Sequence, residues 1–144
     1  MTARILAAGL RRSPLFCELR RRELAKVAAL MGERGFAPGE HVVVEGERGA
    51  GFFVIQAGAA EVTVGGRRIR TLGPGDHFGE VALLLEIPRT ATVTALDGLR
   101  CFTLSSWDFR RLVETNAAVS WRVMVGMARG LVAAQDVLTP STSP

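Results

Sequence analysis

The spacing of apolar positions divides the chain into three parts. Between residues 19 and 30 apolar side chains recur at helical spacing, and Gly32 and Gly35 are expected to end this helix. From 36 to 104 the pattern changes to short apolar or alternating stretches, which glycine and proline interrupt at close intervals. After residue 104 the helical spacing returns. We therefore expect helices on both sides of a β-rich middle part.

The β-rich part predicts several short antiparallel strands. Gly65-Gly66 lies between two of them and is typical of a hairpin turn. Many short strands separated by turn residues are typical of a sandwich or barrel. The expected fold class is therefore α+β and mainly β, an antiparallel β-roll that is also described as a double-stranded β-helix or jelly roll. The predicted strands are 41–44, 51–55, 61–64, 69–72, 90–95 and 100–104.

Two helices are predicted after the roll. Ser105 or Ser106 can cap a short helix over 107–114, and a longer helix is expected from about 117 to 138. On the longer helix, Met124, Leu131 and Leu138 lie seven residues apart. That stripe indicates either packing on the roll or a seam between two copies of the chain.

With 144 residues, the chain is long enough for one domain, which we assign to residues 1–138. The roll occupies about 36–104 of this domain and the C-terminal helices occupy about 107–138. Residues 139–144 are rich in Ser, Thr and Pro and are expected to form a disordered tail. We find no apolar run near the roughly 20 residues of a membrane span and no secretory signal. A cytoplasmic domain without membrane contact is expected.

The net charge of +4 favours an anionic partner, although the positive residues are scattered and nearly all are arginine. Three consecutive arginines at 20–22 form the one dense cluster, which is typical of a solvated helix face. Cys17 and Cys101 match no metal or redox spacing and are expected to be reduced. His41 and His77 have no partner at metal-ligand spacing, so no metal is expected.

One connection between predicted strands carries the candidate chemistry. Residues 75–93 read GDHFGEVALLLEIPRTATV, with a helix-forming stretch over 80–85 that Gly79 opens and Pro88 closes. The N-terminus of such a helix attracts phosphate, because its first N–H groups have no partner in the helix and its dipole adds positive charge. Gly79 lacks a Cβ and so permits the close approach of a ligand.

Two charged side chains flank this short helix. Arg89 supplies an always-ionised fork that pairs with two phosphate oxygens. Glu80 would repel a bare phosphate, but a carboxylate accepts the ribose 2′-hydroxyl in dinucleotide-binding folds. A phosphate-binding group together with a ribose acceptor predicts a nucleotide site. The simpler interpretation, an ion pair between Arg89 and Glu80 without a ligand, stays open at this point.

These residues resemble the phosphate-binding cassette of the cyclic-nucleotide-binding family, which includes catabolite activator proteins, regulatory subunits of cyclic-AMP-dependent kinase and cyclic-nucleotide-gated channels. The family pattern is Phe-Gly-Glu, an apolar residue and Ala, followed by Pro-Arg, a small residue and Ala. The chain has Phe78-Gly79-Glu80-Val81-Ala82 and Pro88-Arg89-Thr90-Ala91 at the family's usual separation. The resemblance extends over about residues 13–135.

The resemblance implies a role for each matching position. Glu80 would accept the ribose 2′-hydroxyl, Arg89 would pair with the exocyclic phosphate oxygens, and Val64 would form an apolar wall for the base. The other ligand-binding positions are Phe78, Gly79, Val81, Ala82, Thr90 and Ala91. The long C-terminal helix would act as a lid, with Arg122, Arg129, Leu131 and Val132 as candidates to cap the base. The implied ligand is cyclic AMP first and cyclic GMP second, with no further cofactor.

Two further expectations concern the cassette. The run Leu83-Leu84-Leu85 is expected to belong to the core rather than to touch the ligand, and the motif residue Phe78 is expected to pack mainly in the core as well. Glu86 stands where the family often has a small or turn-forming residue, so the loop is expected to be shaped differently.

The resemblance implies a sensor without catalytic activity, in which the ligand orders the lid helix and shifts a population of conformations. A homodimer partner or an effector protein would bind through the C-terminal helix. The alternatives are a ligand-free interaction module of the same fold and a regulatory fragment of a larger channel, transporter or transcription factor. A DNA-binding regulator would need a recognition helix after residue 138, and a cupin-like enzyme would need clustered His and carboxylate ligands. We therefore expect neither a nucleic acid partner nor catalysis.

Overall fold

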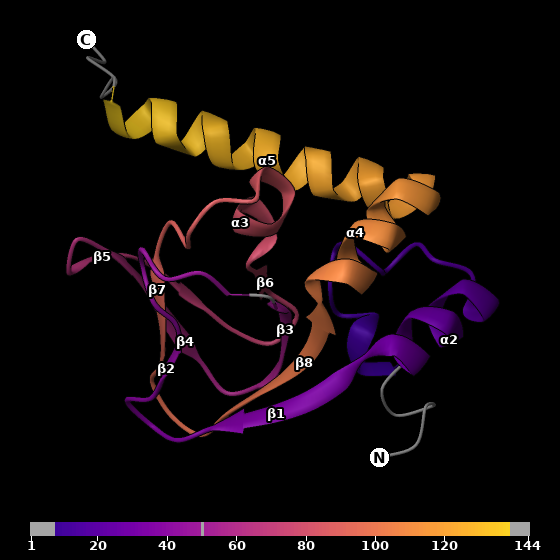
Figure 1. The fold of residues 1–144 in the computed structure, drawn as a ribbon, viewed down its shortest axis with the longest axis horizontal. Helices are drawn as coiled ribbons and strands as arrows, with labels where there is room; N and C mark the ends of the chain where they lie inside the picture. The colour runs from indigo at the N-terminus through magenta and orange to yellow at the C-terminus, as the bar shows by residue number, and fades with distance from the viewer. Residues whose placement is uncertain (1–7, 50, 139–144) are drawn as a thin grey trace, which may run out of the picture.

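The computed structural model describes residues 8–49 and 51–138. Its eight strands form two four-stranded antiparallel sheets that face each other, with helices at their sides (Figure 1). The helices are α2 (Arg21–Leu30), α3 (Glu80–Leu85), α4 (Ser106–Thr115) and α5 (Ala117–Leu138). The strands are β1 (Gly32–Phe36), β2 (His41–Val43), β3 (Gly51–Ala57), β4 (Ala60–Val64), β5 (Arg67–Leu72), β6 (His77–Phe78), β7 (Thr92–Ala95) and β8 (Leu99–Ser105). One sheet has the order β1-β8-β3-β6 and the other β2-β7-β4-β5, which confirms the predicted β-roll.

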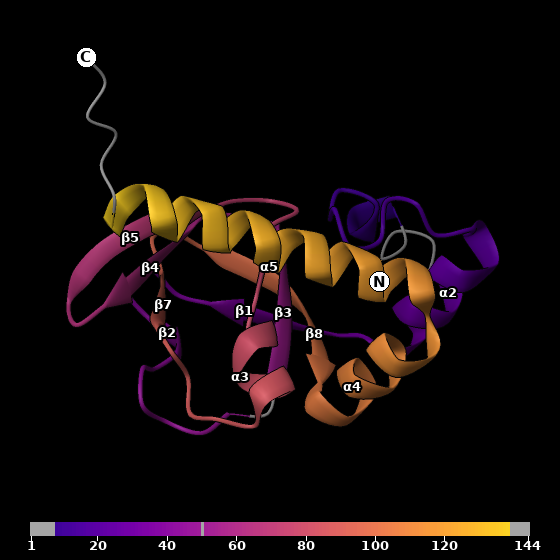
Figure 2. The same cartoon turned by 90° about the horizontal axis from the view of Figure 1, so that it is seen from above.

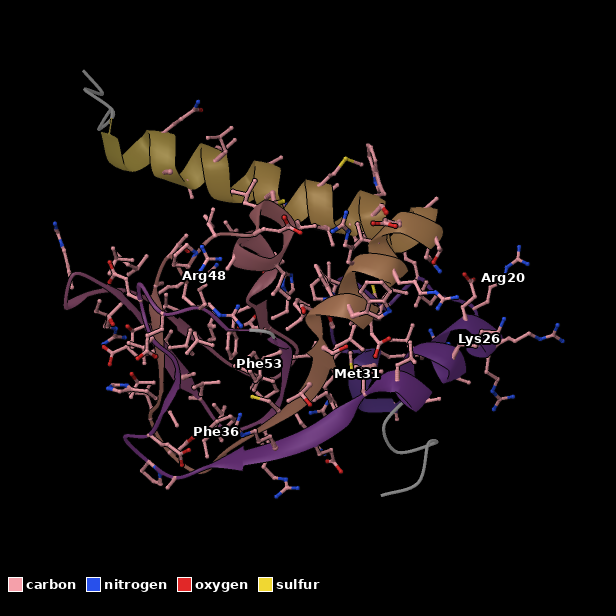
Figure 3. All side chains as sticks on the ribbon, viewed as in Figure 1. Arg20, Lys26, Met31, Phe36, Arg48 and Phe53 are labelled. Atoms are coloured by element: carbon pink, nitrogen blue, oxygen red, sulfur yellow. The ribbon has the colours of Figure 1, made fainter. Side chains whose placement is uncertain are left out.

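Strand β3 is buried on both faces and belongs to two hydrophobic cores. Phe52 and Val54 pack with the helices, whereas Phe53 and Ile55 lie in the core between the sheets. Successive side chains of a strand point to opposite faces, so a strand that is buried on both carries a continuous apolar run. The run at 52–55 is of this kind. Figure 3 shows Phe53 in the interior, where its ring makes an edge contact with Phe36 at 6.4 Å between centroids.

The second core lies between the outer face of the first sheet and helices α2, α4 and α5. The rings of Phe52 and Phe109 are stacked there with centroids 4.5 Å apart. Ser105, not Ser106, caps α4, because its hydroxyl accepts the backbone N–H of Asp108 at 3.1 Å. On the opposite side of α2, Arg20 and Lys26 extend away from the protein (Figure 3). The three arginines at 20–22 are all exposed, which confirms a solvated helix face.

Strand β1 was not predicted from the sequence. Its two glycines were expected to end the preceding helix, but the segment pairs with β8, with Gly32 opposite Thr103 and Phe36 opposite Leu99. Only Phe36 is buried in this strand, so no apolar alternation marks it. The start of another strand was also wrong, since β7 begins at Thr92 rather than at residue 90.

Helix α5 is apolar enough to contradict the expectation that no segment could span a membrane. Residues 117–135 have a mean hydropathy of 1.2 and two charged side chains, so by length and composition alone this helix could cross a membrane. In the fold, Val119 and Val123 of this helix pack in the core and Arg122 is paired with Glu18. These contacts hold the first half of α5 against the domain. The predicted tail at 139–144 lies outside the described residues.

Candidate functional site

A cavity of about 910 Å³ lies between the second sheet, the connection that contains α3, and α5. Figures 1 and 2 show α5 running from α4 across α3 toward the side of β4 and β5. The volume is within the range of small-molecule sites, which combine mostly apolar walls with a few polar groups. The connection contributes Phe78, Gly79, Glu80, Val81, Ala82, Arg89, Thr90 and Ala91. The strands contribute Val43, Val62, Val64, Ile69, Arg70 and Val93, and α5 contributes Gly126, Met127, Gly130, Leu131, Ala133 and Ala134.

The nine positions predicted to bind ligand, which are the eight from the connection and Val64, all line this one cavity. Of the four candidate lid residues, only Leu131 does so. Arg122 is paired with Glu18 instead, and neither Arg129 nor Val132 lines the cavity. The cavity side of α5 consists of small and apolar residues that the sequence analysis missed. The helical periodicity of the sequence groups these residues on one face of α5, but it does not show which face of the helix turns toward the roll.

Arg89 is the central polar group of the site. Its side chain is 5% exposed, and it donates from Nη2 to the carbonyl oxygen of Gly51 at 2.7 Å and from Nη1 to that of Gly79 at 3.2 Å. Its Nε is buried without a hydrogen-bond partner in the described part of the chain. Burial lowers the pKa of Arg89, and the charge of Glu80 opposes this effect. Because a buried charge needs a counter-charge and hydrogen bonds, the guanidinium is suited to hold an anion.

Gly79 makes room for Arg89. Its backbone adopts a φ of 104°, in the left-handed region that side chains disfavour. A Cβ on this residue would lie 2.9 Å from Nη1 of Arg89 and 2.9 Å from the carbonyl oxygen of Gly51. The cassette pattern predicts that this glycine permits the close approach of a ligand. The structure shows that the space is taken by the arginine and the neighbouring strand.

Glu80 is held by a histidine rather than by Arg89. Its Oε2 lies 3.3 Å from Nδ1 of His77, and the two side chains are 16% and 17% exposed. Burial would raise the pKa of the Glu80 carboxyl, but the hydrogen bond and charge of His77, with a contribution from Arg70, outweigh it and lower the pKa. Glu80 is therefore an ionised acceptor. Among the described residues no ion pair joins it to Arg89, so the simpler interpretation from the sequence is not what the fold adopts.

The short helix α3 starts at the cavity. The backbone N–H of Leu83 donates to the carbonyl oxygen of Gly79 at 3.4 Å, so the N–H groups of Val81 and Ala82 precede the first helical hydrogen bond. Leu83 packs against the core, as expected. Leu84 and Leu85, however, are 36% and 61% exposed, contrary to the expectation of core positions, because a helix of six residues buries only one face.

Glu86 ends α3 in a conformation that explains its unusual place in the cassette. It adopts a φ of 55° and a ψ of 44°, the left-handed geometry that a turn-forming residue would supply. Its carboxylate accepts from Nη1 of Arg110 in α4 at 3.1 Å. Glu86 itself thus forms the backbone turn, and its side chain links the cassette to α4.

Comparison with known proteins identifies the family. The family model described as Cyclic nucleotide-binding domain matches residues 33–116, which is more than half of the chain. The chain belongs to the cyclic nucleotide-binding domain family.

Three similar proteins illustrate this relationship. The cAMP-dependent protein kinase regulatory subunit of Yarrowia lipolytica is 42% identical over 106 residues, which cover 72% of this chain and 28% of that protein. A solved structure described as Sp-2Cl-cAMPS bound to PKAR CBD2 has a TM-score of 0.80 and 26% identity, and the match covers 97% of this chain and 94% of that one. The Catabolite Activator Protein of Thermus thermophilus has a TM-score of 0.80 and 27% identity, covering 88% of this chain and 62% of that one. The chain spans about a quarter of the length of the Yarrowia lipolytica protein and similar curated kinase regulatory subunits that it matches.

Proposed function

We propose that this domain is a non-catalytic receptor for a 3′,5′-cyclic nucleotide, with cyclic AMP as the first ligand, and that α5 transmits the occupancy of the site. The observation that carries the proposal is the buried guanidinium of Arg89, which lines the cavity with an unpartnered Nε and with no carboxylate at ion-pair distance among the described residues. An anion that enters the cavity supplies the missing charge.

The polar and apolar walls of the cavity bind different parts of the nucleotide. The cyclic phosphate pairs with Arg89, and the ionised carboxylate of Glu80 accepts the ribose 2′-hydroxyl. The base lies against the apolar strand wall, which includes Val64, and is covered by Leu131 of α5. The cavity thus combines a positive and a negative group of the cassette with apolar strand and helix residues, which suits the mixed polarity of a nucleotide.

Cyclic AMP is preferred over cyclic GMP because of the relatives. The Yarrowia lipolytica protein is described as cAMP-dependent, and one matching structure contains the cAMP analogue Sp-2Cl-cAMPS. Cyclic GMP is the second candidate, because other relatives are described as cGMP-dependent protein kinase, among them that of Toxoplasma gondii with 45% identity over 69 residues.

The same relatives support a proposal for the partner and the compartment. Relatives that are regulatory subunits of a kinase act on another protein, so we propose a cytoplasmic domain with a protein effector or a second copy of itself bound through α5. Trp121 and Met124 on this helix are 61% and 55% exposed and provide apolar surface for such a contact. No nucleic acid partner is included in the proposal.

Calorimetric titration of the chain with cyclic AMP, cyclic GMP and 5′-AMP tests the function. We expect binding of the cyclic nucleotides, and weaker binding of 5′-AMP because its phosphate is not joined to the 3′-oxygen and so is not held in one position relative to the 2′-hydroxyl. A thermal-shift series provides an independent measurement, since a ligand that binds only the folded state raises its stability. The absence of both heat and thermal shift with any cyclic nucleotide at millimolar concentration would contradict the proposal and favour an interaction module without a ligand.

A further inference from the structure

His77 lies beside the ligand cavity without lining it. It belongs to the two-residue strand β6, directly before Phe78 and Gly79, and pairs with Val54 of β3. Its side chain is 17% exposed and its ring lies 5.6 Å from the ring of Phe52, centroid to centroid, with an interplanar angle of 40°. The imidazole is therefore held by the sheet and by an aromatic neighbour that belongs to the helix-facing core.

The hydrogen bond between His77 and Glu80 has a defined direction. An ionised carboxylate only accepts hydrogen bonds, so Nδ1 of the imidazole carries the hydrogen and donates it to Oε2 of Glu80. A carboxylate has two oxygens and about four acceptor positions, and one donor on Oε2 leaves capacity for a hydroxyl of a ligand. His77 thus fixes the orientation of Glu80 without using up its ability to accept.

The two arginines near Glu80 do not provide this restraint. Arg70 of β5 and Arg89 influence the carboxylate through their charge. Neither makes a hydrogen bond with it among the described residues, and a charge attracts a carboxylate without fixing its direction. Of the three, His77 is the group whose geometry selects one rotamer of the Glu80 side chain.

We propose that His77 is a positioning residue that orients the Glu80 carboxylate toward the ribose 2′-hydroxyl, and that the discrimination between ribose and 2′-deoxyribose ligands depends on it. This inference rests on the proposed function and names the residue that gives the site its selectivity for the sugar. A restraint of this kind lowers the loss of side-chain freedom on binding, because the acceptor is already oriented before the hydroxyl arrives.

The test compares two ligands on matched variants. Cyclic AMP and 2′-deoxy-cyclic AMP are titrated calorimetrically against the parent chain, H77F and H77N. Phenylalanine keeps a ring against Phe52 but has no donor, whereas the amide of asparagine can donate at about the position of Nδ1. We expect the parent to prefer cyclic AMP. We expect H77F to bind cyclic AMP about 3- to 10-fold more weakly, as for the loss of one hydrogen bond, and to bind 2′-deoxy-cyclic AMP as the parent does. H77N should restore most of the preference.

The second ligand separates a positioning role from damage to the fold. A variant that is merely destabilised binds both ligands more weakly. Equal losses of affinity for the two ligands would therefore overturn the inference. Unchanged binding of both ligands by H77F would also overturn it, while the parent's affinity for cyclic AMP would leave the proposed function intact. A parent chain that binds neither ligand would contradict the proposed function itself and the role of His77 with it.

Discussion

Arg89 and Glu80 line the same cavity but are held by different partners. The guanidinium donates to the carbonyl oxygens of Gly51 and Gly79, whereas the carboxylate accepts from His77. Two opposite charges that bind each other form a closed pair with little to offer a ligand. Because each is tethered to its own neighbours, both stay available to a molecule that brings an anion and a hydroxyl group together.

Replacement of Arg89 by alanine should abolish most of the nucleotide affinity. The truncation leaves a buried phosphate without its counter-charge, for which we expect a loss of about 2 to 5 kcal/mol in binding free energy. The measurement is calorimetric titration with cyclic AMP. Arg129→Ala is the matched control, since Arg129 is an exposed arginine that does not line the cavity, and it should bind as the parent does. Parental affinity in the Arg89 variant would remove this residue from the site.

Replacement of Gly79 by alanine should lower both stability and affinity. The new Cβ would meet Arg89 and the carbonyl oxygen of Gly51, and the φ of 104° is strained for any side chain. Gly39→Ala is the control, because its φ of 83° is also positive and no atom lies within 4 Å of the added Cβ. We expect the control to lose about 1 to 2 kcal/mol of unfolding free energy from backbone strain alone. Gly79→Ala should cost more, as measured by urea unfolding, and should alone weaken binding.

Leu131 and Val132 distinguish the cavity side of α5 from its outer side. They are adjacent and similarly exposed, at 62% and 57%, but only Leu131 lines the cavity. If α5 covers the base, Leu131→Ala should weaken the binding of cyclic AMP by about 1 kcal/mol, because an apolar contact is lost. Val132→Ala should not change the affinity. The same contact should slow amide hydrogen exchange in residues 126–134 when cyclic AMP is added. Equal affinities of the two variants would show that the helix does not cover the ligand in this way.

Glu80 should give the domain an acid-dependent stability. The pKa of its carboxyl is lowered from its ordinary value of 4.5 in the folded state, so the folded protein binds the proton less readily than the unfolded chain. The stability from this group is therefore complete above pH 4.5 and is lost as the pH falls through the lowered pKa. Urea unfolding between pH 3 and 6 should show this slope in the parent and a smaller slope in E80Q. E114Q, which alters an exposed ion pair, should retain the parental slope.

The sequence predicted the roll and the cassette because both depend on local signals. The turn glycines and the doubly buried run at 52–55 marked the strands, and the Phe-Gly-Glu and Pro-Arg motifs marked the polar ends of the site. Strand β1 gave no such signal, since four of its five residues are exposed and it is defined only by its pairing with β8. Such long-range pairing is not encoded in the hydrophobic pattern of the strand itself.

Two features of the site, the contact between His77 and Glu80 and the cavity face of α5, were missed because they too depend on the folded arrangement rather than on local sequence. The hydrogen bond between His77 and Glu80 spans three residues, yet it forms only because Gly79 turns the chain from β6 into α3. His77 therefore looked like an isolated histidine in the sequence. On α5, a helical repeat was visible, but its orientation is set by Val119 and Val123 in the core, which decide that Leu131 rather than Val132 faces the roll.

The position of β3 has a consequence for how the domain melts. Its alternate side chains belong to both cores, and the carbonyl oxygen of its first residue, Gly51, holds the guanidinium of Arg89. Because the two cores share this strand, we expect them to unfold together, so heating should produce one all-or-none transition. Any reporter placed in the domain, whether on a helix or in a sheet, should then register the same midpoint and the same upward displacement of that midpoint when nucleotide is added.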